Sequence, residues 1–514
     1  MYRRRLALFT LLVVGVSTGY CQEKPKGKVV ADTWNAAFLS GHHSGWVHNI
    51  TRELEVNGAK VYRTQSELEL HVGRETDNIR LRMITGTEET PNNKVTGLFM
   101  QQFLGQAQQM VTTGDVVGEE LLIKVDQAGG QPFTKKIAWN TANLGLRGQD
   151  LIFRERKVKS GDKFTYQSFE PVVNNVLTTH AEVKSTELVK TLDKAMNLLR
   201  VELTSDKLDD GKTGLQMPPM TVWLDKNYDI VRSDTAMEML GQITLHRTSK
   251  AVATNLPIGK PAVNIGLNSL IKLDPNFRIN QPYDAEQATY RITVRDDEHP
   301  ETTFAKDSRQ SIQNQDGNSF DLVIQASPIF APGVNEAKPG EEYLKSNYFI
   351  TSDDAKVQKL TRLAVGPTTD PWQKALNIER YVNLSIKDKN FKEAFATAAQ
   401  VAKTLEGDCT EHAVLAAAMA RAAGIPSRTA VGLIYVDHRQ QGPVMGFHMW
   451  AEVYIDGHWR PIDGTLGRGF VGATHLKIRD QSWHDVQGLA PLLPVYRVLG
   501  KLDIKVRRVQ MRAQ

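Results

Sequence analysis

An alanine-rich segment that opens on a cysteine sets the strongest constraint on how this chain folds. Cys409 follows Asp408, and positions 413–423 are mostly alanine. Asp408 is a favourable N-cap residue because its carboxylate accepts hydrogen bonds from free N–H groups of the first turn. Gly424 and Pro426 then end the helix. The pattern predicts a closely packed helix with Cys409 at its first position.

That position favours reactive thiol chemistry. The positive end of the helix dipole and the free N–H groups both stabilise a thiolate, which is the nucleophilic form of cysteine. A buried structural cysteine is the alternative interpretation, since free cysteines are commonly buried.

A second segment predicts a β-hairpin. Apolar and polar side chains alternate over 448–455, and Asp456-Gly457 is a signal for a two-residue turn. That turn places Ile455 opposite His458. Pro461 cannot donate to a β-ladder, so we expect the return strand to be irregular or to lie at a sheet edge.

The same turn places a base beside an acid. With this register, His448 becomes a diagonal cross-strand neighbour of Asp463 on one face of the hairpin. A slip of one residue would place Asp463 on the other face. A cysteine, a histidine and an aspartate are the components of a thiol nucleophile with an oriented base.

Four linked motifs in this part of the chain resemble the transglutaminase-like superfamily of bacteria. They are the segments 407–412, 421–428, 448–453 and 459–463. The resemblance covers roughly residues 341–485.

The resemblance implies a papain-like core, in which a helix that carries the cysteine packs against a sheet that carries histidine and aspartate. By position, it makes Cys409 the nucleophile, His448 the general base and acid, and Asp463 the residue that orients the imidazole. The superfamily contains crosslinking acyltransferases, peptidases, other amide hydrolases and members with no known activity. The resemblance therefore defines the chemistry of the site more narrowly than it defines the substrate.

The N-terminus has the pattern of an export signal. Arginines at 3–5 precede the apolar run 6–16, and small residues follow at Ser17 and Gly19. An apolar run of this length is too short to span a bilayer comfortably. We expect a signal peptide at 1–21, a periplasmic or secreted mature protein, and no stable membrane span.

The chain contains only two cysteines, Cys21 and Cys409. Lipid attachment at Cys21 is disfavoured because Tyr20 stands where a small residue is wanted. An exported protein with these cysteines cannot rely on a framework of internal disulfides. A lone thiol in an oxidising compartment adds to the case that Cys409 has a chemical role.

The length of 514 residues predicts about three domains and an α+β protein. We expect an antiparallel β-rich domain at 28–250, with one or two helices around 96–111, and a small β module with its linker at 251–335. The transglutaminase-like catalytic domain would occupy 341–514. Its expected helices lie at 355–365, 371–386 and 392–405.

Composition and the remaining histidines exclude several other functions. A net charge of +5 is too diffuse over this length for a nucleic-acid partner. His412 forms at most an incomplete metal site with Cys409, and we expect His475 and His484 at the surface. The sequence therefore predicts no metal and no cofactor.

Two classes of function remain. The first is an exported thiol enzyme that attacks an amide carbonyl, forms a thioester and passes the acyl group to water or to an amine. Its substrate would be a protein or peptide, with a glutamine side chain, a peptide bond and a cell-wall peptide as candidate acyl donors. The second is a catalytically silent structural or binding protein of the cell envelope. The complete set of Cys409, His448 and Asp463 favours the first.

Overall fold

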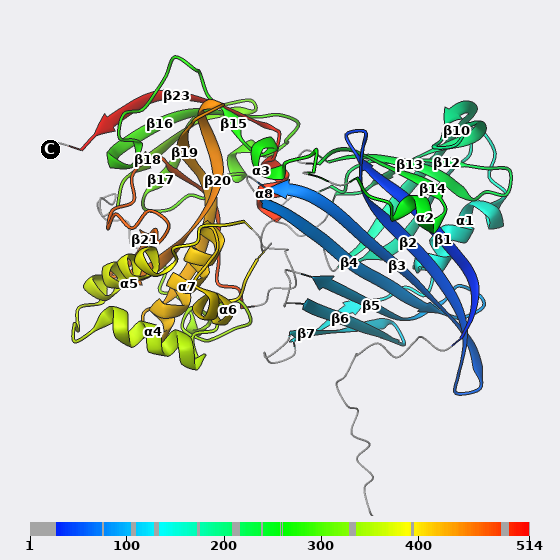
Figure 1. Ribbon diagram of the computed structural model, residues 1–514, viewed down its shortest axis with the longest axis horizontal. Coiled ribbons are helices and arrows are strands. Elements are labelled where there is room, and N and C mark those ends of the chain that lie inside the picture. Colours follow the sequence, from blue (N-terminus) through cyan, green and yellow to red (C-terminus); the bar gives the residue numbers. More distant parts are fainter. Residues whose placement is uncertain are drawn as a thin grey trace, which may run out of the picture.

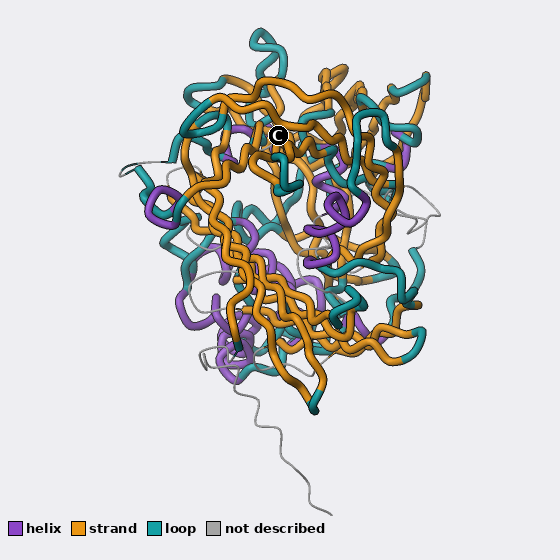
Figure 2. The backbone as a smooth tube through the Cα atoms, turned by 90° about the vertical axis from the view of Figure 1, so that its right-hand side faces the viewer, coloured by secondary structure: helices purple, strands orange, loops and turns teal. Residues whose placement is uncertain are grey.

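The computed structural model describes residues 27–512 except 75–76, 104–108, 128–132, 172–174, 208–215, 238–239, 258, 260, 328–335, 392–394 and 485–492. The predicted signal peptide at 1–21, with Cys21, lies outside the described residues. The chain forms two lobes, one built on a broad curved sheet and one that combines helices with smaller sheets (Figure 1). Figure 2 shows strands as the main element of the backbone. The structure is thus α+β, as predicted.

The first lobe is built on one antiparallel sheet, which has 14 strands among the described residues. The strands β1 to β8 pair in sequence order, and so do β9 to β14. The strand β1 pairs with β14 and joins the two series, so β8 and β9 lie at the two edges of the sheet. The strands are β1 (Lys28–Leu39), β2 (His42–Val56), β3 (Ala59–Arg74), β4 (Asp77–Glu89), β5 (Val95–Phe103), β6 (Gln109–Val117), β7 (Glu120–Gln127), β8 (Phe133–Ala138), β9 (Lys163–Glu170), β10 (Asn175–Lys190), β11 (Ala195–Ser205), β12 (Met220–Leu224), β13 (Ile230–Met237) and β14 (Gly241–Thr248).

The expectation of helices around 96–111 is wrong. The described residues of this segment belong to β5 and β6, which pair with each other and continue the sheet from β4 to β7. Their neighbours supply the backbone hydrogen bonds, and this sheet context overrides local helix preference. In this lobe, helix α1 (Leu146–Arg156) lies against the sheet. Its Ile152 and Phe153 pack against side chains of β10 and β11.

The second lobe contains a five-stranded sheet with helices packed on it. The strand order is β15-β20-β19-β22, and β21 pairs with β20 beside this path. The strands are β15 (Ile271–Lys272), β19 (Ser427–His438), β20 (Gly442–Ile455), β21 (His458–Ile462) and β22 (His475–Gln481). The helices are α4 (Ala355–Val365), α5 (Pro371–Ser385), α6 (Ala398–Thr404) and α7 (Cys409–Ala422), at or within the predicted ranges.

Helix α7 is the centre of this lobe. Its small side chains let α4, α5 and α6 approach it closely, and its buried residues share one core with Met449, Ala451 and Val453 of β20. A helix that is apolar on all sides is expected to be surrounded by protein. The alanine-rich segment therefore acts as a packing centre that fixes where Cys409 lies.

A four-stranded sheet completes the second lobe, with the order β17-β18-β16-β23. Its strands are β16 (Ala285–Val294), β17 (Gln310–Asp316), β18 (Ser319–Gln325) and β23 (Leu502–Met511). The last strand of the chain thus pairs with β16, and one core joins this sheet to Leu433, Met445 and Leu476 of the neighbouring sheet. The segments 285–325 and 502–511 are therefore parts of one packed unit, whereas Val263 and Ile265 pack in the core of the first lobe.

Short helices connect these elements. They are α2 (Lys250–Ala253), α3 (Ile265–Asn268), α8 (Leu493–Val498) and the 3-10 turns at Pro282–Asp284, Pro300–Thr302 and Glu341–Tyr343. In the described part of the chain, none of the helices has both the length and the apolar character needed to cross a bilayer.

Candidate active site

The N-terminus of α7 is capped on both sides of Cys409. The Asp408 carboxylate accepts a hydrogen bond from the N–H of Thr410 (2.7 Å), and the Glu411 carboxylate accepts one from the N–H of Asp408 (2.9 Å). This reciprocal arrangement is a capping box. Cys409 is a free thiol, partly exposed, at the first helical position, as the sequence predicts.

The hairpin has the predicted register. Ile455 pairs with His458 and Ala451 with Ile462, around a turn in which Asp456 and Gly457 both have positive φ. Positive φ at both central residues is the requirement of a type I′ turn. Among the described strands, β21 pairs only with β20, so it lies at an edge.

The hairpin brings the predicted base and acid into contact. His448 Nε2 lies 2.8 Å from Asp463 Oδ2, and both side chains are buried. The Asp463 Oδ1 atom accepts a hydrogen bond from the N–H of Thr465 (2.9 Å), which fixes the orientation of the carboxylate. The Cys409 thiol is among the groups that raise the pKa of the His448 ring, which it faces. Because Nε2 faces Asp463, Nδ1 is the ring nitrogen left for the sulfur.

The electrostatics of this group favour an imidazolium. Burial lowers the pKa of His448, but the Asp463 carboxylate and the Cys409 thiol outweigh burial and raise that pKa to about 10. Burial likewise acts to raise the pKa of Asp463, but His448 and His475 together hold it well below its usual range. The aspartate is therefore an acceptor at neutral pH, and each facing histidine nitrogen donates to it.

The expectation that His475 lies at the surface is wrong. This residue begins β22, its side chain is fully buried, and its Nε2 lies 3.1 Å from the same Asp463 Oδ2 atom. Its ring also contacts the Trp450 ring edge-to-face, with 5.4 Å between centroids. Burial lowers the pKa of His475, so the neutral ring donates its Nε2–H to Asp463.

Sequence reasoning missed His475 because its contact with Asp463 depends on long-range strand pairing. The chain leaves the hairpin after β21, and β22 returns to pair with β19, where His475 lies opposite Ile434. No local pattern around position 475 indicates that pairing.

The group of His448, Asp463 and His475 is the one set of three potential metal ligands found among the described residues, with its ligand atoms within 4.8 Å of one another. Both histidine nitrogens that face the carboxylate carry protons, and a metal ligand must offer a lone pair instead. The two hydrogen bonds account for the cluster.

His412, which the sequence offered as part of an incomplete metal site, is buried. Its Nδ1 atom forms a hydrogen bond with the Asp408 carbonyl (2.6 Å).

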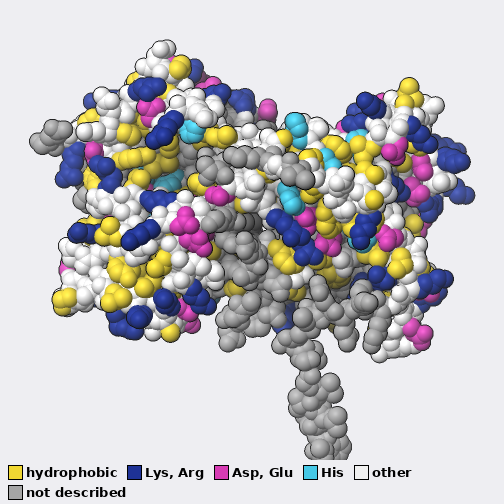
Figure 3. Space-filling model, viewed as in Figure 1, with side chains coloured by type: hydrophobic (Ala, Val, Ile, Leu, Met, Phe, Trp, Pro, Cys, Tyr) yellow, Lys and Arg dark blue, Asp and Glu magenta, His cyan; other side chains and the backbone are white. Residues whose placement is uncertain are grey.

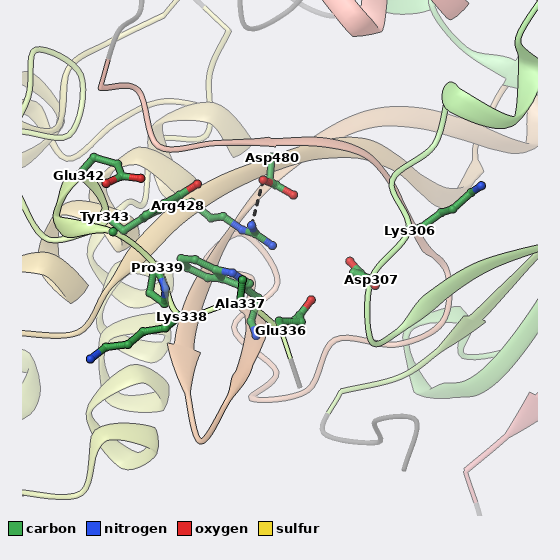
Figure 4. A pocket seen from close by; sticks show the side chains of 12 residues that line it. Lys306, Asp307, Glu336, Ala337, Lys338, Pro339, Glu342, Tyr343, Arg428 and Asp480 are labelled. Carbon is green, nitrogen blue, oxygen red and sulfur yellow. Dashed lines mark hydrogen bonds and ion pairs between the residues drawn. The ribbon is translucent and has the colours of Figure 1, made fainter. Parts of the chain in front are cut away.

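A separate pocket lies on the charged face of the sheet. It has a volume of about 370 Å³, and Figure 4 shows Arg428 and Asp480 on one side and Glu336 and Asp307 on the other. None of its lining residues belongs to the cysteine, histidine and aspartate group.

Buried ion pairs form the floor beside this pocket. Arg428 lies 2.7 Å from Glu452, and Lys477 lies 2.6 Å from Asp307 and 3.1 Å from Glu452. These pairs join β19, β20 and β22 on the face that also carries His448, and they account for the charged residues there as a structural network.

Comparison with known protein families finds a match for the core of the second lobe. Residues 358–464 match the family model described as the Transglutaminase-like superfamily, and this part of the chain belongs to that superfamily. The matched segment contains Cys409, His448 and Asp463. No curated protein matches the chain.

Similar solved structures are distant in sequence. One is described as a candidate cysteine protease from Cytophaga hutchinsonii, with 17% identity, 44% of this chain and 86% of that chain covered, and a TM-score of 0.28. Another is the periplasmic domain of TgpA from Pseudomonas aeruginosa bound to ethylmercury, with 16% identity, 36% and 91% coverage, and a TM-score of 0.21. A third is a β-barrel-like protein of a domain of unknown function from Brucella abortus, with 10% identity, 42% and 95% coverage, and a TM-score of 0.31.

Proposed function

We propose that this protein is an exported thiol enzyme that attacks an amide carbonyl through Cys409, His448 and Asp463. The observation that carries the proposal is the buried contact of 2.8 Å between His448 Nε2 and Asp463 Oδ2, next to a cysteine at a helix N-terminus. The substrate would be a protein or peptide, and the site of action the periplasm or the cell exterior.

The first half-reaction forms a thioester. The Cys409 thiolate attacks the amide carbon, the C–N bond breaks, and the His448 imidazolium gives its proton to the leaving amine or ammonia. Asp463 holds the His448 ring so that Nδ1 faces the sulfur. Its carboxylate also stabilises the positive charge of the imidazolium. The backbone N–H of Cys409 is a candidate oxyanion donor, since the cap engages the N–H groups of the next residues and leaves this one.

The second half-reaction returns the free thiol. His448, now neutral, takes a proton from the incoming water or amine, which attacks the thioester carbon and releases Cys409. Water makes the protein a peptidase or amidase, and an amine makes it an acyltransferase. The residues around Cys409 support the thioester chemistry that both reactions share.

The test is the reactivity of the thiol. Iodoacetamide labelling across a pH series, with mass spectrometry of the labelled peptide, should find Cys409 alkylated well below pH 8. Cys409→Ala, which suits an alanine-rich helix, should keep the thermal unfolding profile and lose the label. A catalytically silent envelope protein would instead show Cys409 reacting like the thiol of free glutathione, and that result would overturn the proposal.

The acyl acceptor is tested separately. A blocked glutamine-containing peptide is incubated with the protein, with and without a small primary alkylamine. Ammonia release without amine incorporation indicates hydrolysis of the side-chain amide, amine incorporation indicates acyl transfer, and shortened peptide indicates peptide-bond cleavage. Cys409→Ala is the matched control in each assay.

A further inference from the structure

The large sheet of the first lobe reaches the N-terminus of the cysteine helix. Arg74 ends β3, and its Nη2 atom lies 2.6 Å from Asp408 Oδ2. The Asp408 side chain is 3% exposed and that of Arg74 is 22% exposed, so the ion pair is largely shielded from water. A residue more than 300 positions earlier in the chain therefore contacts the cap of α7.

The contact is part of a larger junction between the lobes. The N–H of Phe391 donates to Asp77 Oδ2 at the start of β4 (2.9 Å), and the Arg74 guanidinium lies over the Phe391 ring, 5.4 Å from its centroid. The N–H of Gly73 donates to the carbonyl of Val263 (2.8 Å), whose side chain packs in the core of the first lobe. Arg74 and Asp77 of this hairpin therefore contact the second lobe.

The cap needs a cation at this place. Asp408 and Glu411 are both buried and lie close together, and a negative charge beside Cys409 opposes formation of the thiolate. The Arg74 charge acts on Asp408 through the ion pair. Burial and the neighbouring Asp408 raise the pKa of Glu411 well above its ordinary value, and Arg74 opposes that rise through space. Arginine keeps its charge at all relevant pH values, so the compensation is permanent.

We propose that Arg74 is a positioning residue of the cysteine site: the first lobe completes the site by neutralising the Asp408 cap, which leaves the helix terminus electropositive toward Cys409. The proposal rests on the proposed function in so far as Cys409 is the nucleophile. It gives the β-rich lobe a role in the chemistry of the second lobe, in addition to any binding role.

Other charged and titratable groups lie around the N-terminus of α7, and of these Glu411 also senses the Arg74 charge. From the elements packed around the N-terminus of α7 they are His412, Glu411, Lys389, His448, Asp463, His475 and Glu379. These side chains are the same in the wild type and in the Arg74 variants, so each profile is compared in the same surroundings.

The experiment compares the pH profile of Cys409 alkylation by iodoacetamide in the full chain and in three variants. Arg74→Gln should move the midpoint of the profile about one pH unit higher, which slows alkylation about ten-fold below the midpoint. Arg74→Lys keeps the charge and should stay closer to the wild type. Arg80→Gln, which removes an exposed arginine that pairs with Glu69 on the same hairpin, should leave the profile unchanged.

A double variant separates charge from structure. Arg74→Gln combined with Asp408→Asn removes both charges, and the midpoint should return to within a few tenths of a unit of the wild type. A profile for Arg74→Gln that coincides with the wild type would overturn the inference, as would a double variant that stays shifted. If wild-type Cys409 itself reacts no faster than glutathione, the proposed function fails instead, so the two failures are distinct.

Discussion

At the scale of single residues, Asp463 is the residue that connects the two histidines of the site. One of its oxygens accepts from two histidines, His448 and His475, and the other accepts from the backbone N–H groups of Thr465 and Leu466. These donors on a buried carboxylate keep it ionised despite the cost of burial. A carboxylate held in this way stabilises the charged form of His448, and this form pairs with a thiolate.

Replacing Asp463 by asparagine should weaken the site without removing it. The amide can accept the His448 hydrogen bond but carries no charge, so the pKa of His448 falls from about 10 toward or below its ordinary value. We expect the alkylation profile of Cys409 to move to higher pH, and turnover to fall less than in His448→Ala. Coincident profiles for Asp463→Asn and the wild type would show that Asp463 does not act on the base.

The same substitution has a consequence for stability. A histidine whose pKa is raised in the folded state contributes stability that is complete below about pH 6.5 and is lost as pH rises through about 10. Wild-type protein should therefore lose free energy of unfolding between pH 7 and 10, and Asp463→Asn should lose less over the same range. Urea unfolding at a series of pH values measures the difference.

His475 should matter through Asp463 rather than through the substrate. His475→Leu removes one of the donors to the carboxylate and keeps an apolar side chain against Trp450, so we expect a shift of the Cys409 alkylation profile in the same direction as Asp463→Asn and smaller in size. His484→Leu, at an exposed histidine, is the matched control. Equal profiles for His475→Leu and the control would assign His475 to packing alone.

At the scale of elements, the hairpin turn sets the distance between base and acid. Asp456 and Gly457 have φ values of 53° and 82°. Both values lie in the left-handed region, so the turn depends on a backbone conformation that favours glycine. The two-residue loop holds Ile455 opposite His458 and so holds Asp463 next to His448.

Gly457→Ala should destabilise the protein by about 1 kcal/mol, because alanine pays a conformational cost at positive φ that glycine does not. Thermal unfolding measures the loss. The register should survive, because Ile462, Ala451 and Val453 stay buried on the core face, and so the Cys409 alkylation profile should not change. A changed profile would mean that the turn is strained enough to move Asp463.

At the scale of the whole molecule, the strand β23 is an integral part of the second lobe. The strand β23 pairs with β16 along almost its whole length, and its Leu502 and Ile504 are buried in the core that continues into the sheet of the site. Charged side chains of both signs are interspersed over the face seen in Figure 3, which agrees with the diffuse charge of the sequence. The family core at 358–464 thus lies within a larger packed unit.

Removal of residues 502–514 should destabilise the second lobe, although Asp463 lies well before the deletion. β16 would keep β18 but lose its other partner, and its unpaired edge would be open to association with other chains. We expect a lower unfolding temperature and faster limited proteolysis within 285–325. A truncated protein that unfolds like the full chain would show that β23 is dispensable.

The sequence by itself determined the features that depend on neighbours along the chain. Asp408 caps α7, Asp370 caps α5 at Pro371, and Asp456-Gly457 sets the hairpin, because caps and two-residue turns involve residues only a few positions apart. These local rules were enough to predict the contact between His448 and Asp463.

Only the tertiary structure decided which distant segments meet. His475 reaches Asp463 through the pairing of β22 with β19, and Arg74 reaches Asp408 across the two lobes. Residues 95–103 became a strand through the partners on either side. The physical reason is the same in each case: a buried charge or an unpaired backbone group takes its partner from whatever the packed fold places beside it, and local sequence carries no record of that neighbour.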